Sequence, residues 1–225
     1  MINKYFDKIY CINLDSRPDR WEECLIEFKK IGIQNHIERF PAISLHPGIA
    51  GCTKSHYEIV KLAKKNNYKN VLIFEDDVSF TSNNFFDILE KSFSQLTNQN
   101  LVYDLLYLGG NLNPDNTINY LIDDNLAKLT YCKTTHAYAI NSSVYNKFIN
   151  DFKNIDWGDN NNWFHGNQNR LNIDVWLYRN FQTLGNVYGV YPCLAEQRLS
   201  FSNLLNQESY FPMKENWNKL TKQND

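Results

Sequence analysis

Residues 71–80, VLIFEDDVSF, combine the pattern of a buried strand with three consecutive acids, and they are the most informative part of the sequence for the fold. Residues 71–74 form a short and almost uninterrupted apolar run, which is typical of a strand covered on both faces in an α/β sheet. Three carboxylates, Glu75, Asp76 and Asp77, follow without a break before the chain becomes apolar again. Like charges at the end of a core strand repel one another unless a cation or a set of donors lies beside them. This strand end is therefore the first place to look for a functional site.

The segments on either side of 71–80 alternate between strand and helix patterns. Runs rich in β-formers predict strands at 8–14, 36–43, 71–74 and 104–110. Apolar residues at helical spacing predict helices at 16–31, 51–65 and 83–97. This order predicts an α/β fold, with an open sheet flanked by helices.

The remainder of the chain is less regular. Residues 126–132 and 135–141 are expected to form a β pair, and a polar loop is expected at 156–169. Helices are predicted at 142–152 and 171–181, and a last strand at 186–197.

Composition limits the classes of protein to which the chain can belong. With 225 residues, 43% of them hydrophobic, and no linker-like tract, we expect a single domain over residues 1–225. A formal net charge of −2 gives no global field that would attract nucleic acid or an anionic membrane. No run of about 18 apolar residues is present, so neither a secretion signal nor a membrane span is expected. Five scattered cysteines without a C-x-x-C pair fit a reducing compartment, and we expect a cytoplasmic location.

The acidic run at 75–77 has the chemistry of a metal site. Ligands of open α/β sheets bind beyond the carboxyl ends of the strands, where these acids lie. If the backbone stays extended, Glu75 and Asp77 face one pocket and Asp76 faces the other side. Hard oxygen ligands suit Mg²⁺ or Mn²⁺, and such an ion usually completes its shell with ligand phosphates. The alternative is a solvated turn whose acids cap the next helix.

The segment NLDSRPDR, residues 13–20, is a second candidate site. It follows the first strand and leads into a helix, whose free N–H groups favour an anion. Arg17 and Arg20 could grip a diphosphate or a uracil carbonyl from here. The alternative is that both arginines pair only with neighbouring acids of the same segment.

Isolated polar residues elsewhere are weaker candidates. Lys54 and His56 lie near the start of a predicted helix in GCTKSHYEI, and His136 lies in THAYAI. Histidines of this kind are more often ordinary structural residues than functional ones. Asp174, an acid among apolar residues, is either a desolvated catalytic carboxylate or a buried helix cap.

Taken together, seven segments resemble glycosyltransferase family 25, which includes bacterial lipooligosaccharide transferases and collagen galactosyltransferases. They are YCINLDSRPDR, GCTKSHYEI, VLIFEDDVSF, DLLYLGG, THAYAI, NIDVWLY and YPCLAEQ with SFSN, and they occur in the family's order between about residues 8 and 203. The resemblance implies a GT-A-like nucleotide-diphospho-sugar transferase fold, a UDP-sugar donor, a divalent metal and inversion at the anomeric carbon. The asparagine-rich composition is similar to that of giant-virus members, which makes a viral source and a location in host cytoplasm or virion an alternative to a bacterial cytoplasm.

The resemblance also implies roles for the acids. By position, Glu75 and Asp77 would hold the metal, Mn²⁺ or Mg²⁺, and Asp76 would hold the ribose or the metal. Asp174 takes the late acidic position. Because inversion needs a base that accepts the acceptor's hydroxyl proton, we choose Asp174 as that base.

The nucleotide-binding residues follow in the same way. The donor would lie along the backbone of Asn13, Leu14 and Asp15 and beside Arg17 and Arg20. Lys54 and His56 would lie next to the donor as well.

The acceptor implied by the resemblance is a glycan, a lipooligosaccharide or the hydroxylysine of a collagen-like protein, and a homodimer is left open. Two other functions remain as alternatives. One is a non-catalytic homologue that binds a nucleotide sugar. The other is a metal-dependent phosphohydrolase, although no D-x-D-x-[TV] loop follows the first strand.

Overall fold

The computed structural model describes residues 2–112, 119–159, 172–183, 185–198, 200–202, 207–209 and 213–222. The first half of the chain comprises η1 (Ile2–Lys4), β1 (Lys8–Asn13), α1 (Pro18–Lys30), η2 (Gln34–His36), β2 (Glu38–Pro41), α2 (Gly48–Lys65), β3 (Asn70–Glu75), β4 (Val78–Phe80), α3 (Phe85–Asn98), β5 (Leu105–Tyr107) and β6 (Asn111–Leu112). The second half comprises β7 (Tyr120–Asp123), β8 (Leu126–Lys128), β9 (Cys132–Lys133), β10 (Ala137–Asn141), α4 (Ser142–Phe152), α6 (Ile173–Leu177), the π-helical turn η4 (Tyr178–Gln182), β11 (Val187–Val190), β12 (Ala195–Gln197), β13 (Ser200–Ser202), β14 (Gln207–Ser209) and α7 (Met213–Trp217).

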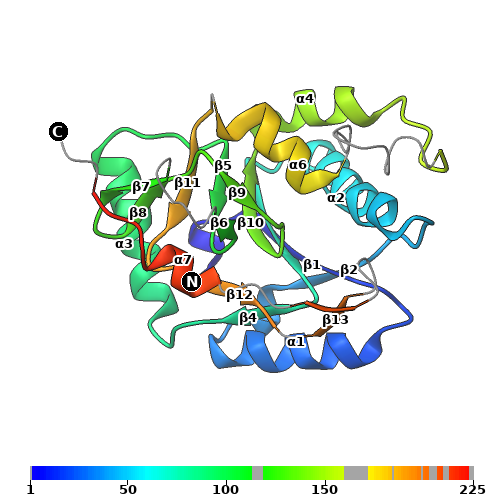
Figure 1. Ribbon diagram of the computed structural model, residues 1–225, viewed down its shortest axis with the longest axis horizontal. Coiled ribbons are helices and arrows are strands. Elements are labelled where there is room, and N and C mark those ends of the chain that lie inside the picture. Colours follow the sequence, from blue (N-terminus) through cyan, green and yellow to red (C-terminus); the bar gives the residue numbers. More distant parts are fainter. Residues whose placement is uncertain are drawn as a thin grey trace.

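An eight-stranded sheet in the order β2-β1-β3-β10-β5-β11-β8-β7 forms the centre of the molecule. The pairs β1–β2, β1–β3 and β5–β11 are parallel, whereas β10 runs antiparallel between β3 and β5. The sheet is therefore mixed, and helices cover it on both faces (Figure 1). This confirms the α/β class and the open sheet flanked by helices.

Alternating side chains divide the strands between two cores. In β3, Val71 and Ile73 join the core that α2, α4 and α6 cover, whereas Leu72 and Phe74 join the core that α1 and α3 cover. The alternation follows from the two-residue period of a strand, and both faces must be apolar because helices bury both. All four side chains are fully buried. The apolar run at 71–74 is thus the meeting point of the two cores.

The same alternation sets the place of the acids. Glu75, the next residue after Phe74, falls on the α2 side of the sheet. The chain then turns at residues 76–77 and continues as β4, which pairs antiparallel with β12. Segment 195–198 therefore covers the turn that carries the acids, although it lies more than a hundred residues away in the sequence.

Most predicted elements are present close to their expected positions. The main differences concern strand pairing: β8 pairs with β7 and β11, and β10 pairs with β3 and β5, so the expected β pair of 126–132 with 135–141 was wrong. The expected last strand divides into β11 and β12 around Pro192, which has no N–H to donate to a strand ladder. Helix α2 begins at Gly48 instead of residue 51. Residues 160–169 of the expected polar loop lie outside the described residues.

Within the described chain, every helix is too short or too polar to cross a lipid bilayer.

Candidate active site

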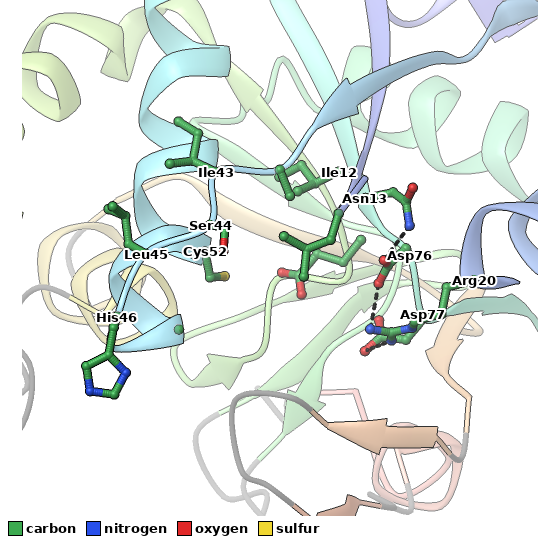
Figure 2. A pocket seen from close by; sticks show the side chains of 14 residues that line it. Ile12, Asn13, Arg20, Ile43, Ser44, Leu45, His46, Cys52, Asp76 and Asp77 are labelled. Carbon is green, nitrogen blue, oxygen red and sulfur yellow. Dashed lines mark hydrogen bonds and ion pairs between the residues drawn. The ribbon is translucent and has the colours of Figure 1, made fainter. Parts of the chain in front are cut away.

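A cavity of about 360 Å³ opens at the carboxyl ends of β1 and β3. Its walls come from the end of β1, from the loop between β2 and α2, from α2 and from all three acids, as Figure 2 shows in close-up. The volume is within the range of small-molecule sites, and the position is the one where open α/β sheets bind ligands. Of the residues predicted to bind the nucleotide, Asn13, Leu14, Arg20 and Asp76 line this cavity.

Asp76 and Asp77 share one arginine. Arg20 Nη1 lies 2.8 Å from Asp76 Oδ1, and Arg20 Nη2 lies 3.3 Å from Asp77 Oδ2. Asn13 Nδ2 donates to the other oxygen of Asp76 at 2.8 Å, and Figure 2 shows these contacts together. Burial raises the pKa of Asp76, but the Arg20 charge and the Asn13 hydrogen bond oppose the rise. The structure thus brings the loop of residues 13–20 and the acidic run together, as the sequence predicted.

Asp77 is less well compensated than Asp76. Burial, with the nearby Glu75 carboxylate as a second cause, raises the pKa of Asp77 to about 7. Gln197 Nε2 donates to Oδ2 at 3.2 Å, yet Oδ1 is buried and has no hydrogen-bond partner in the part of the chain that the structure describes. A buried carboxylate oxygen without a donor is costly unless a cation completes its environment. The donor chemistry at Asp77 therefore fits a hard divalent cation such as Mn²⁺ or Mg²⁺.

Glu75 has a different set of partners. Thr135 Oγ1 donates to Glu75 Oε1 at 2.5 Å, and His56 Nε2 lies 3.3 Å from the same oxygen. Although burial disfavours its charged form, the hydrogen bonds from His56 and Thr135 lower the pKa of Glu75. His56 therefore touches an acid of the cavity from the α2 side.

The expected division of the three acids between opposite sides of an extended strand was wrong. β3 ends at Glu75, and residues 76–77 form a turn, so Glu75, Asp76 and Asp77 all line the same cavity. Arg198 stabilises this turn, since its backbone N–H donates to Asp77 O and its Nη2 donates to Asp76 O, both at 2.7 Å.

Four residues predicted to bind the nucleotide do not line the cavity: Asp15, Arg17, Lys54 and His56. Arg17 pairs with Asp19 at 2.8 Å, and Asp15 accepts from Arg39 at 2.7 Å. Lys54 Nζ lies 5.5 Å from the centre of the Trp157 ring, where a cation–π contact stabilises it. Their expected roles at the nucleotide stay predictions.

Asp174 lies in the first turn of α6, outside the lining of the cavity. Its Oδ1 accepts the N–H of Val175 at 2.7 Å, one of the free N–H groups of the first turn, although the N-cap position itself is occupied by Asn172. Burial raises the pKa of Asp174; the Val175 hydrogen bond and the Lys133 charge oppose the rise, while the Glu75 charge adds to it. The geometry is compatible with both the catalytic and the capping interpretation.

Several residues at the site were missed in the sequence. Arg39 Nε donates to Asn13 Oδ1 at 2.8 Å, Tyr138 OH lies 3.0 Å from His56 Nδ1, and Thr135 and Arg198 contact the acidic run. Each comes from a distant segment, so no local motif indicates it. Tyr138 and Thr135 could be found only by knowing that β10 pairs with β3.

Comparison with known proteins identifies the family. Residues 43–162 match glycosyltransferase family 25 (LPS biosynthesis protein), which is more than half of the chain and includes the loop before α2, α2 itself and all three acids. The chain belongs to glycosyltransferase family 25. Family membership and the open mixed sheet together agree with the expected GT-A-like fold.

Individual relatives of this glycosyltransferase family 25 chain share part of its sequence. It is 28% identical over 171 residues to the human inactive glycosyltransferase 25 family member 3, covering 64% of this chain and 29% of that protein. It is 29% identical over 163 residues to a glycosyltransferase 25 family member of Drosophila melanogaster, covering 60% of this chain and 26% of that protein. The chain thus spans less than a third of these relatives' length.

Among solved structures, a glycosyltransferase involved in the glycosylation of the major capsid of PBCV-1 is similar at a TM-score of 0.47 and 11% identity, over 81% of this chain and 80% of that one.

The burial of His136 generates a prediction about pH and stability. His136 is fully buried, with Nδ1 3.1 Å from Thr134 Oγ1, and burial lowers its pKa to about 4. An unfolded histidine titrates near 6.5, so between these values the unfolded chain binds the proton and the folded one does not. His136 therefore contributes stability above about pH 6.5 that is lost as pH falls towards 4. We expect a loss of about 2–3 kcal/mol between pH 7.5 and 4.5 from this group.

The measurement is urea unfolding across this pH range for the wild type and for His136→Gln, with His36→Gln as the control. The free energy of unfolding should fall less with acid in His136→Gln than in the other two. Parallel curves for all three proteins would contradict the assignment.

Proposed function

We propose that this chain is a metal-dependent, inverting glycosyltransferase that moves a sugar from a UDP-sugar to a hydroxyl acceptor. Family membership supports sugar transfer. One observation supports the proposal that the chain binds a metal and a nucleotide. A buried carboxylate oxygen of Asp77, next to Arg20 in the cavity at the ends of β1 and β3, has no hydrogen-bond partner among the described residues.

The cavity has the parts that a nucleotide diphosphate needs. Asp76 and Asp77, with Glu75 beside them, would hold Mn²⁺ or Mg²⁺, which supplies charge stabilisation for the leaving diphosphate. Arg20 lies between the two aspartates, where its guanidinium can turn towards a phosphate without leaving them. The opposite wall carries Ala42 and Ile43, an apolar surface suited to the flat face of a nucleobase.

The proton acceptor is proposed to be Asp174. Inversion in one displacement needs a base on the far side of the sugar from the leaving group. Asp174 sits outside the cavity lining but close enough to Glu75 for their charges to interact, and its raised pKa improves its ability to accept a proton. The acceptor hydroxyl would belong to a glycan, a lipooligosaccharide or a hydroxylysine of a collagen-like protein.

A second candidate function is nucleotide-sugar binding without catalysis. The human relative is named an inactive family member, and the region shared with it covers 64% of this chain. A chain of this kind would keep the cavity and Arg20 but would not turn over its donor. Release of UDP distinguishes the two functions.

We therefore expect the chain to release UDP from at least one UDP-sugar in the presence of Mn²⁺. Asp77→Ala should lower the rate of UDP release by at least about 10²-fold. The change should leave the melting temperature close to that of the wild type, because it removes one of three mutually repelling acids. The measurement is UDP release over a panel of UDP-sugars, with and without hydroxyl acceptors.

Asp87→Ala is the matched control, since Asp87 is an exposed acid in the first turn of α3. Donor binding without UDP release would favour the non-catalytic homologue, and release of UMP or inorganic phosphate would favour a phosphohydrolase. A folded Asp77→Ala protein with wild-type turnover would exclude Asp77 from the metal site.

A separate prediction concerns Asp174. If Asp174 is the base, Asp174→Asn keeps the shape and the cap but removes the proton acceptor, so turnover should fall by about 10²–10⁴-fold while donor affinity barely changes. If Asp174 is only a helix cap, asparagine caps nearly as well, and both activity and melting temperature should persist. Turnover and donor affinity, measured separately on this variant, decide between the two, and weakened donor affinity would instead place Asp174 at the sugar.

A further inference from the structure

A second group of metal-ligand side chains lies on the α2 side of the cavity. The sulfur of Cys52, a ring nitrogen of His56 and a carboxylate oxygen of Glu75 all lie within 4.8 Å of one another. Cys52 and His56 are four residues apart in α2 and so share one face of the helix. Glu75 reaches them because the alternation of β3 directs it to the α2 side. Figure 2 shows Cys52 on the wall opposite Arg20 and the two aspartates.

His56 is already oriented as a ligand. Its ring is fully buried, with Nε2 3.3 Å from Glu75 Oε1 and Nδ1 3.0 Å from the hydroxyl of Tyr138. A metal-bound histidine usually donates its other ring N–H to a fixed partner, which sets the tautomer and the ring orientation. In the metal-free site Nε2–H donates to Glu75 and Nδ1 accepts from Tyr138. The other tautomer, with Nδ1–H donating to Tyr138, would present the lone pair of Nε2 to an ion beside Glu75. Thr135 fixes the Glu75 carboxylate in turn.

We propose that Cys52, His56 and Glu75 form a zinc site. One sulfur, one nitrogen and one oxygen donor make a set that zinc accepts and that Mg²⁺ and Mn²⁺ do not prefer. Ordinary zinc–ligand lengths place neighbouring donor atoms roughly 3.3–3.6 Å apart, so the three donors need move by only about 1 Å to meet one ion.

This site shares only Glu75 with the metal site expected for the family, which uses Asp77 and neither Cys52 nor His56. Asp76 and Asp77 are held by Arg20 on the other side of the cavity, whereas the partners of Glu75 are His56 and Thr135. The proposal does not rest on sugar transfer, since it needs only the three donors and their supports. Cys52 binds as the thiolate, and its proton passes to solvent.

The arrangement also indicates how the ion would be used. Three protein ligands with a free position are typical of catalytic zinc sites, whereas structural sites have four. Cys52 and Glu75 both line the cavity, so the free position opens towards it. A bound molecule with an oxygen donor could complete the coordination there.

The test is binding of Zn²⁺, and of Co²⁺ as its spectroscopic substitute, to the full chain kept reduced by a thiol-free reductant. We expect a thiolate-to-cobalt charge-transfer band that saturates at one Co²⁺ per chain and that Zn²⁺ removes by competition. The band, and not the total amount of bound cobalt, reports this site, because the acids at 76–77 would bind a second ion. Cys52→Ala should abolish the band, and Tyr138→Phe, which removes only the partner of His56, should weaken Zn²⁺ affinity by about 10–100-fold.

Two variants serve as matched controls. Cys193→Ala removes another buried cysteine, and Asp87→Asn alters an exposed acid of α3 that does not line the cavity, so both should keep the band and the Zn²⁺ affinity of the wild type. Melting temperatures without metal confirm that each variant folds. If Cys52→Ala does not fold, the Zn²⁺ affinity of Tyr138→Phe decides. A loss of about 10–100-fold supports the zinc site, and wild-type affinity overturns it.

A wild-type chain that binds Co²⁺ without the charge-transfer band would overturn the proposal. So would wild-type Zn²⁺ affinity in both Cys52→Ala and Tyr138→Phe, or loss of the band in Cys193→Ala while Cys52→Ala keeps it. None of these results depends on UDP release, so failure of the zinc site and failure of the proposed transferase can be distinguished.

Discussion

The compensation of three consecutive carboxylates at the end of a buried strand is the constraint on which this structure depends. Glu75, Asp76 and Asp77 cannot be left unpartnered beside two apolar cores, because burial of an uncompensated charge costs several kcal/mol. Four segments provide the compensating groups: β1 with α1 supplies Asn13 and Arg20, α2 supplies His56, the segment that leads into β10 supplies Thr135, and the segment of β12 supplies Gln197 and Arg198. Of these groups Asn13 and Arg20 also line the cavity, so part of the set that compensates the acids faces the proposed ligand site.

One carboxylate oxygen of the three acids, Asp77 Oδ1, has no hydrogen-bond donor among the described residues, and the proposed metal binding rests on this atom. Arg20 satisfies Asp76 and one oxygen of Asp77, while the other oxygen of Asp77 lacks a donor within the described part of the chain. On the opposite wall, a thiol, an imidazole and Glu75 converge. Oxygen donors on one side and a mixed sulfur, nitrogen and oxygen set on the other favour different cations. The two proposed sites would therefore select different metals on the two walls of the cavity.

Local sequence patterns predicted most helices and strands, and they indicated the two parts of the site formed by residues 13–20 and 75–77. The apolar run at 71–74, the acids after it and the segment of residues 13–20 all follow from periodicity and from the rule that ligands bind at strand ends. Strand partners did not follow, since β10 inserts antiparallel between β3 and β5, and pairing between distant segments leaves no local pattern. For that reason Thr135, Tyr138 and Arg198 were missed. The turn at 76–77 was the alternative left open beside an extended strand, because residues 71–80 alone do not decide between the two.

The proposed function depends on the acids at the end of β3, Glu75, Asp76 and Asp77, which would hold a cation that in turn binds a nucleotide diphosphate. The most direct test is calorimetric titration of UDP into the protein, once with Mn²⁺ and once with EDTA. A cation that bridges carboxylates and diphosphate must strengthen UDP binding, and UDP must strengthen Mn²⁺ binding by the same factor. We expect the affinity for UDP to be at least about 5-fold higher with Mn²⁺ than with EDTA. Equal UDP affinities in Mn²⁺ and EDTA would contradict it.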